Sequence, residues 1–354
     1  MDIKIRQEKI IALRMQRQYL TPEKKANKEE YNQLFRDMSP IPVRYWSAPG
    51  DPPSISSRAD FDDFEYNFKL RKNRDIIKGR FQNGSVGYVE FDEFELFIGL
   101  YKKAIGRLSR MQFELLDLIE HEDGIGVAGM KRATGWLVKN ITPELHKLQE
   151  SFLVFEDQTD NEGDRMFFKL ESVFPEIDIN KYTQFDALKI VLLRFAKLNV
   201  LFDVSMARSF YKLPLKNIQT AADELVNSGE LVCYAGEYML KSDFDYLTGS
   251  ESVHLKIEKS VIVTHRNDFL VKSNEHILKD KFKHEKYGVL QYILIDGVFR
   301  GALCGNFKFG PAVLEDIVLD LPDDEKISRR EEILNAVYEH HDREASPLKK
   351  YCGN

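Results

Sequence analysis

The sequence predicts an α+β fold, in which units of helices followed by a β-hairpin recur along the chain and a β-rich region comes after them. Three observations lead to this expectation. Helices followed by two short strands are indicated over residues 184–241, and the same order is indicated over residues 111–170. From about Val253 the helical periodicity gives way to short apolar runs separated by turn residues.

The clearest unit is residues 203–241, which read as a short helix, a turn at Pro214, a second helix and a tight hairpin around Ala235-Gly236. Ser228-Gly229 ends the second helix. One face of that helix is apolar at helical spacing, at Leu215, Ile218, Ala222 and Leu225. This is the winged-helix plan, whose second helix typically enters the major groove of DNA. Four polar side chains near its start are therefore expected to touch phosphates and base edges: Lys212, Lys216, Asn217 and Gln219.

Two further units are indicated before this one. Over residues 111–170 a helix is followed by a short second element, a third helix that Thr142-Pro143 is expected to cap, and two strands. Residues 1–105 give helices at 2–19, 21–38, 61–78 and 91–105, with a hairpin that turns at Asn83-Gly84. These residues are interpreted as a more degenerate copy.

The C-terminal part is expected to be a small β-rich domain, either a sheet or, as the preferred expectation, a barrel-like one. Its predicted strands are Ser260–Thr264, Val289–Ile295, Phe299–Cys304 and Val313–Leu319, with a hairpin turn at Asp296-Gly297. An acidic helix is expected over residues 325–342. The predicted domains are therefore 1–110, 111–182, 183–250 and 251–354.

Composition limits the classes of function. The net charge is −6, but residues 311–345 contain eleven Asp or Glu against four Lys or Arg, which leaves the rest of the chain near +1. No apolar run is long enough to span a bilayer, and the N-terminus lacks the apolar core of a signal peptide. Three scattered cysteines indicate neither a disulfide framework nor a metal site. A cytoplasmic, nucleoid-associated monomer without a metal or a small-molecule cofactor is expected.

A basic cluster is the main electrostatic candidate for phosphate binding. Six basic residues and one acidic residue lie between positions 69 and 80; the basic ones are Lys69, Arg71, Lys72, Arg74, Lys78 and Arg80. Such a face is compatible with DNA binding on an otherwise acidic protein. The alternative is that these charges only solvate a helix.

Four stretches carry a resemblance to a known family: LRMQRQYL near the N-terminus, RFQNGSVGYVEFDE at 80–93, LVNSGELV at 225–232, and YGVLQYILIDGVFRGALCG at 287–305. The sequence resembles the bacterial winged-helix DNA-binding proteins that include the AlkZ/YcaQ interstrand-crosslink DNA glycosylases. The resemblance implies three tandem winged helices around a C-terminal β-barrel, duplex or damaged DNA as the partner, and hydrolysis of an N-glycosidic bond as the reaction.

The catalytic motif of that family, Gln-x-Gln or Gln-x-Asp, is not intact. At the comparable place, after the first helices, the chain has Ala48-Pro49-Gly50-Asp51-Pro52-Pro53, so Asp51 would match the second member and Pro49 the first. A proline side chain cannot orient a water, whereas a carboxylate can still act as a base or stabilise an oxocarbenium-like centre. The only literal Gln-x-Gln, Gln16-Arg17-Gln18, lies inside a helix, where the two glutamines point to different faces. Asp51 is therefore the catalytic candidate, although Gly-Asp-Pro is also a common turn.

The proline-rich loop supplies further candidates for DNA contact. Tyr45 and Trp46 are a pair that could stack on a flipped or unpaired base, or could anchor the loop to the core. Arg58 at the end of the loop is included among the expected DNA contacts. Two functions stay open on this evidence: a repair protein that binds damaged duplex with weak or absent base excision, and a non-catalytic winged-helix regulator.

Overall fold

The computed structural model describes residues 5–44, 50–55, 57–157, 165–307 and 311–353. Its first region contains α1 (Gln7–Arg17), α2 (Lys28–Met38), α3 (Asp63–Lys72) and α4 (Phe94–Tyr101), with the hairpin β1 (Ile76–Phe81) and β2 (Ser85–Glu90) between α3 and α4. Asn27 and Glu30 form a capping box that begins α2. The hairpin turns where predicted, because Asn83 (φ 58°) and Gly84 (φ 79°) adopt the left-handed conformation that such turns require.

The helix expected over 61–78 is shorter than predicted. It ends at Lys72, and Arg74 then takes a positive φ of 64°, which cannot continue a right-handed helix. The β-branched pair Ile76-Ile77 that follows is buried at the start of β1.

The second region follows the predicted order of helices and strands. It contains α5 (Arg110–His121), β3 (Ile125–Gly126), α6 (Val127–Thr134), α7 (Val138–Glu150), β4 (Val154–Asp157), β5 (Met166–Lys169) and the short α8 (Leu170–Val173). The strands form an antiparallel sheet in the order β3-β5-β4. The expected cap at Thr142-Pro143 is wrong, because α7 already begins at Val138 and Pro143 lies inside it.

The third region repeats this arrangement. It contains α9 (Gln184–Asn199), β6 (Leu201–Phe202), α10 (Val204–Tyr211), α11 (Leu215–Asn227), β7 (Leu231–Tyr234), β8 (Glu237–Leu240) and α12 (Lys241–Thr248), with strand order β6-β8-β7. Three of the four residues predicted for the apolar face of α11 are buried: Ile218, Ala222 and Leu225. Leu215, at the first position of the helix, is instead exposed.

The C-terminal region is an open sheet and not a barrel. Its strands β9 (Val261–His265), β10 (Gly288–Ile295), β11 (Val298–Asn306) and β12 (Val313–Leu319) are antiparallel in the order β12-β11-β10-β9. The strands at the two ends of this order, β12 and β9, do not pair with each other, so the sheet is not closed among the described residues. Helix α13 (Phe269–Lys281) packs on one face, and α15 (Arg330–Tyr338), which follows α14 (Asp323–Ser328), packs on the other. Helix α13 was not predicted from the sequence, although Asp268 precedes it as a cap, with Oδ1 accepting a hydrogen bond from Leu270 N–H.

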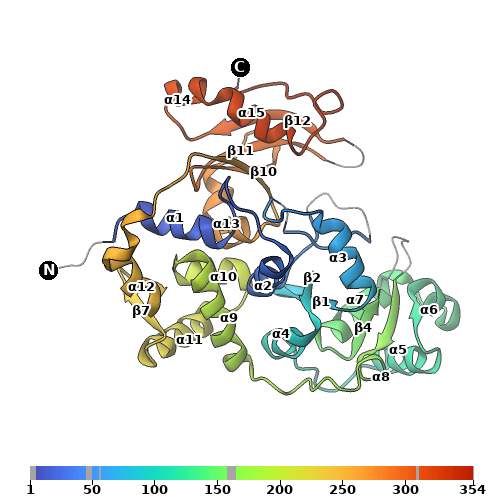
Figure 1. Cartoon of the computed structure of the whole chain (residues 1–354). Coiled ribbons are helices and arrows are strands. Elements are labelled where there is room, and N and C mark those ends of the chain that lie inside the picture. Colours follow the sequence, from blue (N-terminus) through green and yellow to red (C-terminus); the bar gives the residue numbers. More distant parts are fainter. Residues whose placement is uncertain (1–4, 45–49, 56, 158–164, 308–310, 354) are drawn as a thin grey trace.

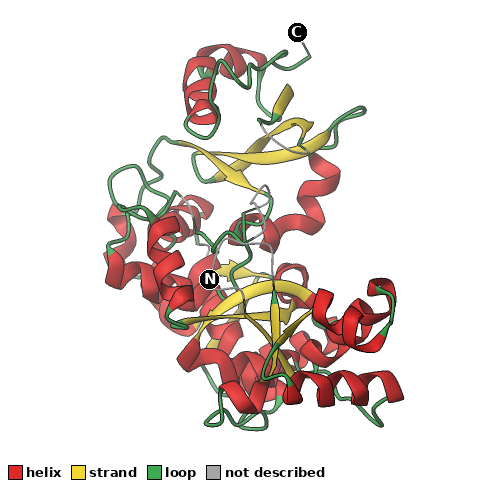
Figure 2. Ribbon diagram, turned by 90° about the vertical axis from the view of Figure 1, so that its right-hand side faces the viewer, coloured by secondary structure: helices red, strands yellow, loops and turns green. Residues whose placement is uncertain are grey.

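Helix α1 packs against both the third region and the C-terminal region. Ile10 and Leu13 pack against the third region, whereas Ile11 and Met15 pack against α13 and the C-terminal strands. Figure 1 shows α1 lying between α12 and α13, and Figure 2 shows the C-terminal sheet above the strands of the other regions. The first and third regions share one large core, so their relative placement is fixed by apolar packing.

Candidate nucleic-acid interface

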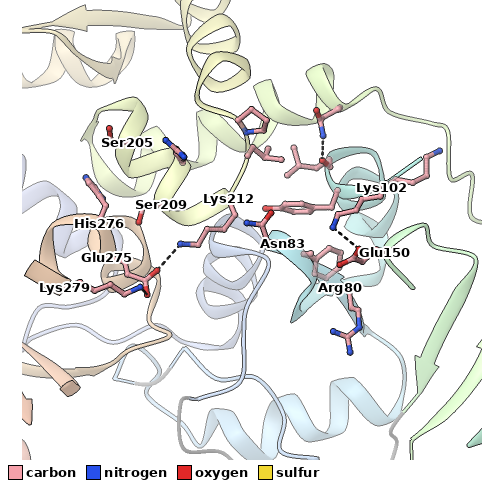
Figure 3. Close-up of a pocket in the computed structure, with 18 residues that line it drawn as sticks. Arg80, Asn83, Lys102, Glu150, Ser205, Ser209, Lys212, Glu275, His276 and Lys279 are labelled. Carbon is pink, nitrogen blue, oxygen red and sulfur yellow. Dashed lines mark hydrogen bonds and ion pairs between the residues drawn. The ribbon is translucent and has the colours of Figure 1, made fainter. Parts of the chain in front are cut away.

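A pocket of about 750 Å³ lies where the first, third and C-terminal regions meet. Its walls come from the β1–β2 hairpin and α4 on one side, and from α10, the start of α11 and α13 on the other (Figure 3). Six basic side chains line it against two acidic ones; the basic ones are Arg80, Lys102, Lys103, Arg208, Lys212 and Lys279. Charge of one sign in a concave site concentrates the field, so this pocket favours anions.

The start of α11 adds to the positive character of the pocket. Pro214 lines the pocket and precedes the helix without offering a side-chain cap, and the first turn contains no acidic residue. The N–H groups at the start of a helix carry partial positive charge, and they bind anions when they are not capped. Lys216 stands exposed in this same turn.

Three lysines converge on one carboxylate at the wall between α10 and α13. Lys212 Nζ is 2.9 Å from Glu275 Oε2, and Lys279 and Lys272 lie 3.0 and 3.4 Å from Oε1. Burial would raise the pKa of Glu275, but the bond from Lys212 and the charges of the other two lysines lower it to about 2. One carboxylate balances only one of three ammonium groups, so an excess of positive charge remains at this wall.

The lining of the pocket also has an apolar part. Phe81, Leu100, Tyr101 and Leu213 contribute to it and are themselves largely buried. The hydroxyl of Tyr101 is buried without a hydrogen-bond partner among the described residues. Burial raises the pKa of this hydroxyl well above its usual value, so the hydroxyl stays neutral.

A second pocket, of about 960 Å³, has the opposite character. It lies between α1 and α2, and six acidic side chains line it against four basic ones. Asp37 in its wall is buried and bonded to Lys197 Nζ at 2.6 Å. The sequence reading missed this carboxylate, since Asp37 stands among ordinary helical residues and Lys197 is far away along the chain. An excess of acidic groups disfavours a phosphate backbone, so the first pocket is the stronger candidate for DNA.

The structure brings some of the predicted DNA-binding residues to the first pocket. Arg80 and Lys212 both line it, and Lys216 lies two residues beyond Pro214. Asn217 Nδ2 donates to Oε1 of Gln184, another lining residue, at 3.3 Å. Gln219 is engaged elsewhere, because its amide donates to Asp223 Oδ1 and to the hydroxyl of Tyr238.

Much of the predicted basic cluster is used to hold the second region in place. Arg74 pairs with Asp157 at 2.6 Å, and Lys78 pairs with the buried Glu156. Arg80 donates to Gln149 Oε1 at 2.9 Å and lies 2.7 Å from His146 Nε2. These partners belong to α7 and β4, so the charges join β1 to the second region and are not a free phosphate-binding face.

The remaining members of the cluster divide between surface and interior. Lys69 and Lys72 are exposed on α3. Arg71 is buried and donates to the carbonyl oxygen of Gly50, so it positions the backbone next to Asp51.

Arg58 has no exposed surface and forms a bidentate ion pair with Asp268, at 2.5 and 3.2 Å. In this arrangement it cannot reach a phosphate, contrary to the expectation from sequence. Burial raises the pKa of Asp268, but the adjacent guanidinium lowers it further, with a net decrease. The pair joins the first region to the N-terminus of α13, which is a structural role.

The catalytic candidate is not part of either pocket. Asp51 is half-buried in the loop between α2 and α3. Tyr45 and Trp46, the expected stacking pair, lie outside the described residues, as does Pro49. No group of three or more His, Cys, Asp or Glu in the described ranges has the arrangement of a metal site.

Comparison with solved structures identifies the architecture. The chain has the fold of a DNA glycosylase. It superposes on the Streptomyces sahachiroi DNA glycosylase AlkZ with a TM-score of 0.66 and 14% identity, covering 97% of this chain and 98% of the other. No protein-family model matches the sequence, and no curated protein matches it. The predicted resemblance is thus confirmed for the fold over almost the whole chain, whereas 14% identity leaves the reaction to be argued from the residues.

Within the described ranges, no helix is both long and apolar enough to cross a membrane.

Proposed function

We propose that this protein binds duplex DNA, including damaged duplex, as a monomer, and that it excises bases weakly or not at all. The observation that carries the proposal is the first pocket, in which six basic side chains face two acidic ones beside the uncapped start of α11. Its AlkZ-like fold supports a repair-related role, since that neighbour is a DNA glycosylase.

The second and third regions are interpreted as winged helices. In the third region α10 and α11 would be the helix-turn-helix, and the β7–β8 hairpin would be the wing. A recognition helix presents its first residues to DNA, and the start of α11 lies at the pocket. Lys216 and Arg208 are exposed there and form no ion pair with any residue that the structure describes. They are the side chains best placed to neutralise phosphates.

Weak catalysis follows from the composition of the proline-rich loop. Asp51 offers one carboxylate, and the position that would hold the second polar group is a proline. General-base assistance typically contributes about 10²–10⁴-fold. A loop with half of the usual pair would leave little base excision.

The test is a fluorescence anisotropy titration of a labelled duplex with the wild type and two double variants. Arg208→Ala/Lys216→Ala removes one Arg and one Lys at the proposed interface. Arg330→Ala/Lys350→Ala removes the same residue types from the C-terminal region, where both are exposed. The proposal expects the first double variant to bind about 10-fold or more weakly, with the second near the wild type. Equal affinities for all three proteins, or no binding of duplex by the wild type, would refute it.

A further inference from the structure

A small pocket of about 240 Å³ lies within the second region. Helices α6 and α7 and strand β5 provide its apolar lining, which consists of Val127, Ala128, Val138, Leu145 and Phe167. Pockets for small-molecule ligands usually enclose about 300–1,000 Å³. A cavity below this range instead suits one aliphatic side chain of a protein partner.

Large apolar side chains are exposed around this small pocket. Val138, which lines it, is 44% exposed, and the preceding Leu137 is 53% exposed. Met166 is 38% exposed and pairs across the sheet with Gly126, next to the lining residue Val127. Neighbouring exposed apolar side chains mark surfaces that a protein covers, whereas phosphate oxygens need polar donors.

Three cations form a basic rim at the small pocket. Lys131 and Arg132 follow the lining residues Val127 and Ala128 by four positions, so each lies one helical turn beyond the lining on the same face of α6. Lys139 lies in the first turn of α7. All three are exposed and form no ion pair with any residue that the structure describes. The rim therefore suits an acidic partner.

Helix α14 of the same chain has the complementary composition. Its Ile327 is 77% exposed. Asp324 precedes Ile327 by three positions, on the same face of α14, and Glu331 lies in the first turn of α15. Both carboxylates are exposed and lack an ion-pair partner in the described part of the chain. This surface offers one aliphatic side chain flanked by two carboxylates.

The two surfaces lie far apart on one molecule. Figure 1 shows α14 at the top of the molecule and α6 at its right-hand edge. One copy therefore cannot join them within itself. Two different surfaces that meet between copies form a head-to-tail contact, which can continue from one copy to the next.

We propose that α14 of one copy docks on the second region of another copy, with Ile327 in the small pocket and Asp324 and Glu331 at the basic rim. One short helix on one small pocket makes a weak contact, because stable interfaces bury about 1,200–2,000 Å². The protein is therefore a monomer in dilute solution, as in the proposed function. Copies that lie side by side on DNA have an effective concentration on the order of millimolar, at which this contact forms.

Sedimentation velocity of the full chain tests the contact without DNA, over a series of protein concentrations at low salt. Lys131→Glu/Arg132→Glu reverses the charge of the basic rim. Asp324→Lys/Glu331→Lys reverses the charge beside Ile327. All four positions are exposed, so neither variant disturbs a core.

Matched controls change the same residue types elsewhere. Glu251→Lys/Asp280→Lys reverses two exposed carboxylates that form no ion pair with a described residue. Ile327→Ser removes the apolar anchor, and Ile277→Ser is its control, since Ile277 is 53% exposed on α13.

The wild type and both controls are expected to self-associate with a Kd on the order of 100 µM. Each charge-reversal variant should associate about 10-fold or more weakly, because like charges then face each other. Ile327→Ser should weaken association about 10-fold through the loss of a buried aliphatic side chain. A 1:1 mixture of the two charge-reversal variants should recover association, because each reversed surface then meets an oppositely charged one.

A wild type that stays monomeric over the whole series would overturn the inference and leave the DNA-binding proposal intact. An effect of charge reversal at only one of the two surfaces, or a mixture that does not associate, would overturn it as well. If Lys131→Glu/Arg132→Glu weakens duplex binding while the wild type does not self-associate, the basic rim is a DNA contact and the inference is wrong.

Discussion

Arg58→Met tests whether Arg58 is a structural residue or a DNA contact. In the wild type its guanidinium forms two bonds to Asp268, and neither side chain is appreciably exposed. Methionine keeps an unbranched apolar side chain of comparable length and removes only the charged fork. The substitution leaves the Asp268 carboxylate buried without its counter-charge.

The expected loss of stability is large because of this uncompensated charge. Breaking one side of a buried ion pair costs about 3–5 kcal/mol, which is more than the pair itself contributes. Asp268 also accepts from Leu270 N at 2.9 Å as the cap of α13. Asn can keep this cap, so Arg58→Met/Asp268→Asn should recover part of the loss by removing the buried charge.

Urea unfolding followed by circular dichroism measures this effect, with DNA affinity measured on the folded protein as the second readout. The structure predicts that Arg58→Met lowers the free energy of unfolding by about 3–5 kcal/mol, that the double variant is more stable than Arg58→Met, and that duplex affinity of the folded protein is unchanged. Wild-type stability together with weakened DNA binding would refute the reasoning and restore Arg58 to the DNA interface.

Three other predictions follow from individual groups. Burial lowers the pKa of His265 and of His341 to about 4, so their contribution to the free energy of unfolding should be fully present above about pH 6.5 and decline as the pH falls toward 4, by about 3 kcal/mol for His265. The urea midpoint should therefore depend less on pH in His265→Gln than in the wild type. The same pH dependence in both proteins would contradict this prediction. Tyr101→Phe should raise the free energy of unfolding by about 1 kcal/mol, because it removes a buried hydroxyl that lacks a partner, and thermal unfolding that shows a clear loss would argue against this. Any residual excision of alkylated bases should disappear in Asp51→Asn, as measured by strand cleavage after alkaline treatment, and robust excision that survives this substitution would mean that the catalytic site is elsewhere.

Local sequence patterns were sufficient to predict most of the helices and strands. Short apolar runs on either side of Asp296-Gly297 predicted the β10–β11 hairpin, and Asn83-Gly84 predicted the turn between β1 and β2. Strand closure depends on how distant segments pair, and no local pattern reports it. The strands at the two ends of the C-terminal sheet do not pair with each other, so the expected barrel is an open sheet.

The candidate site was harder to predict for the same reason. Six basic residues within twelve positions read as a phosphate-binding face, but Asp157 and Glu156, the partners of Arg74 and Lys78, stand about eighty positions later. Arg58 and Asp268 are separated by 210 positions. The first pocket has the same origin, since Lys102, Arg208 and Lys279 come to one pocket only in the folded chain. The helix-start signal of α11 indicated Lys212 and Lys216, which lie in or beside the pocket, and their contact with DNA stays a prediction.

The salt dependence of duplex affinity tests the central claim, that DNA lies at the rim of the first pocket. Each phosphate neutralised by a protein cation contributes about 0.9 to the slope of log affinity against log salt concentration. Arg208→Ala/Lys216→Ala should therefore have a slope about 1.8 smaller in magnitude than the wild type, whereas Arg330→Ala/Lys350→Ala should keep the wild-type slope. A wild-type slope in the first double variant would place the DNA on another face of the protein.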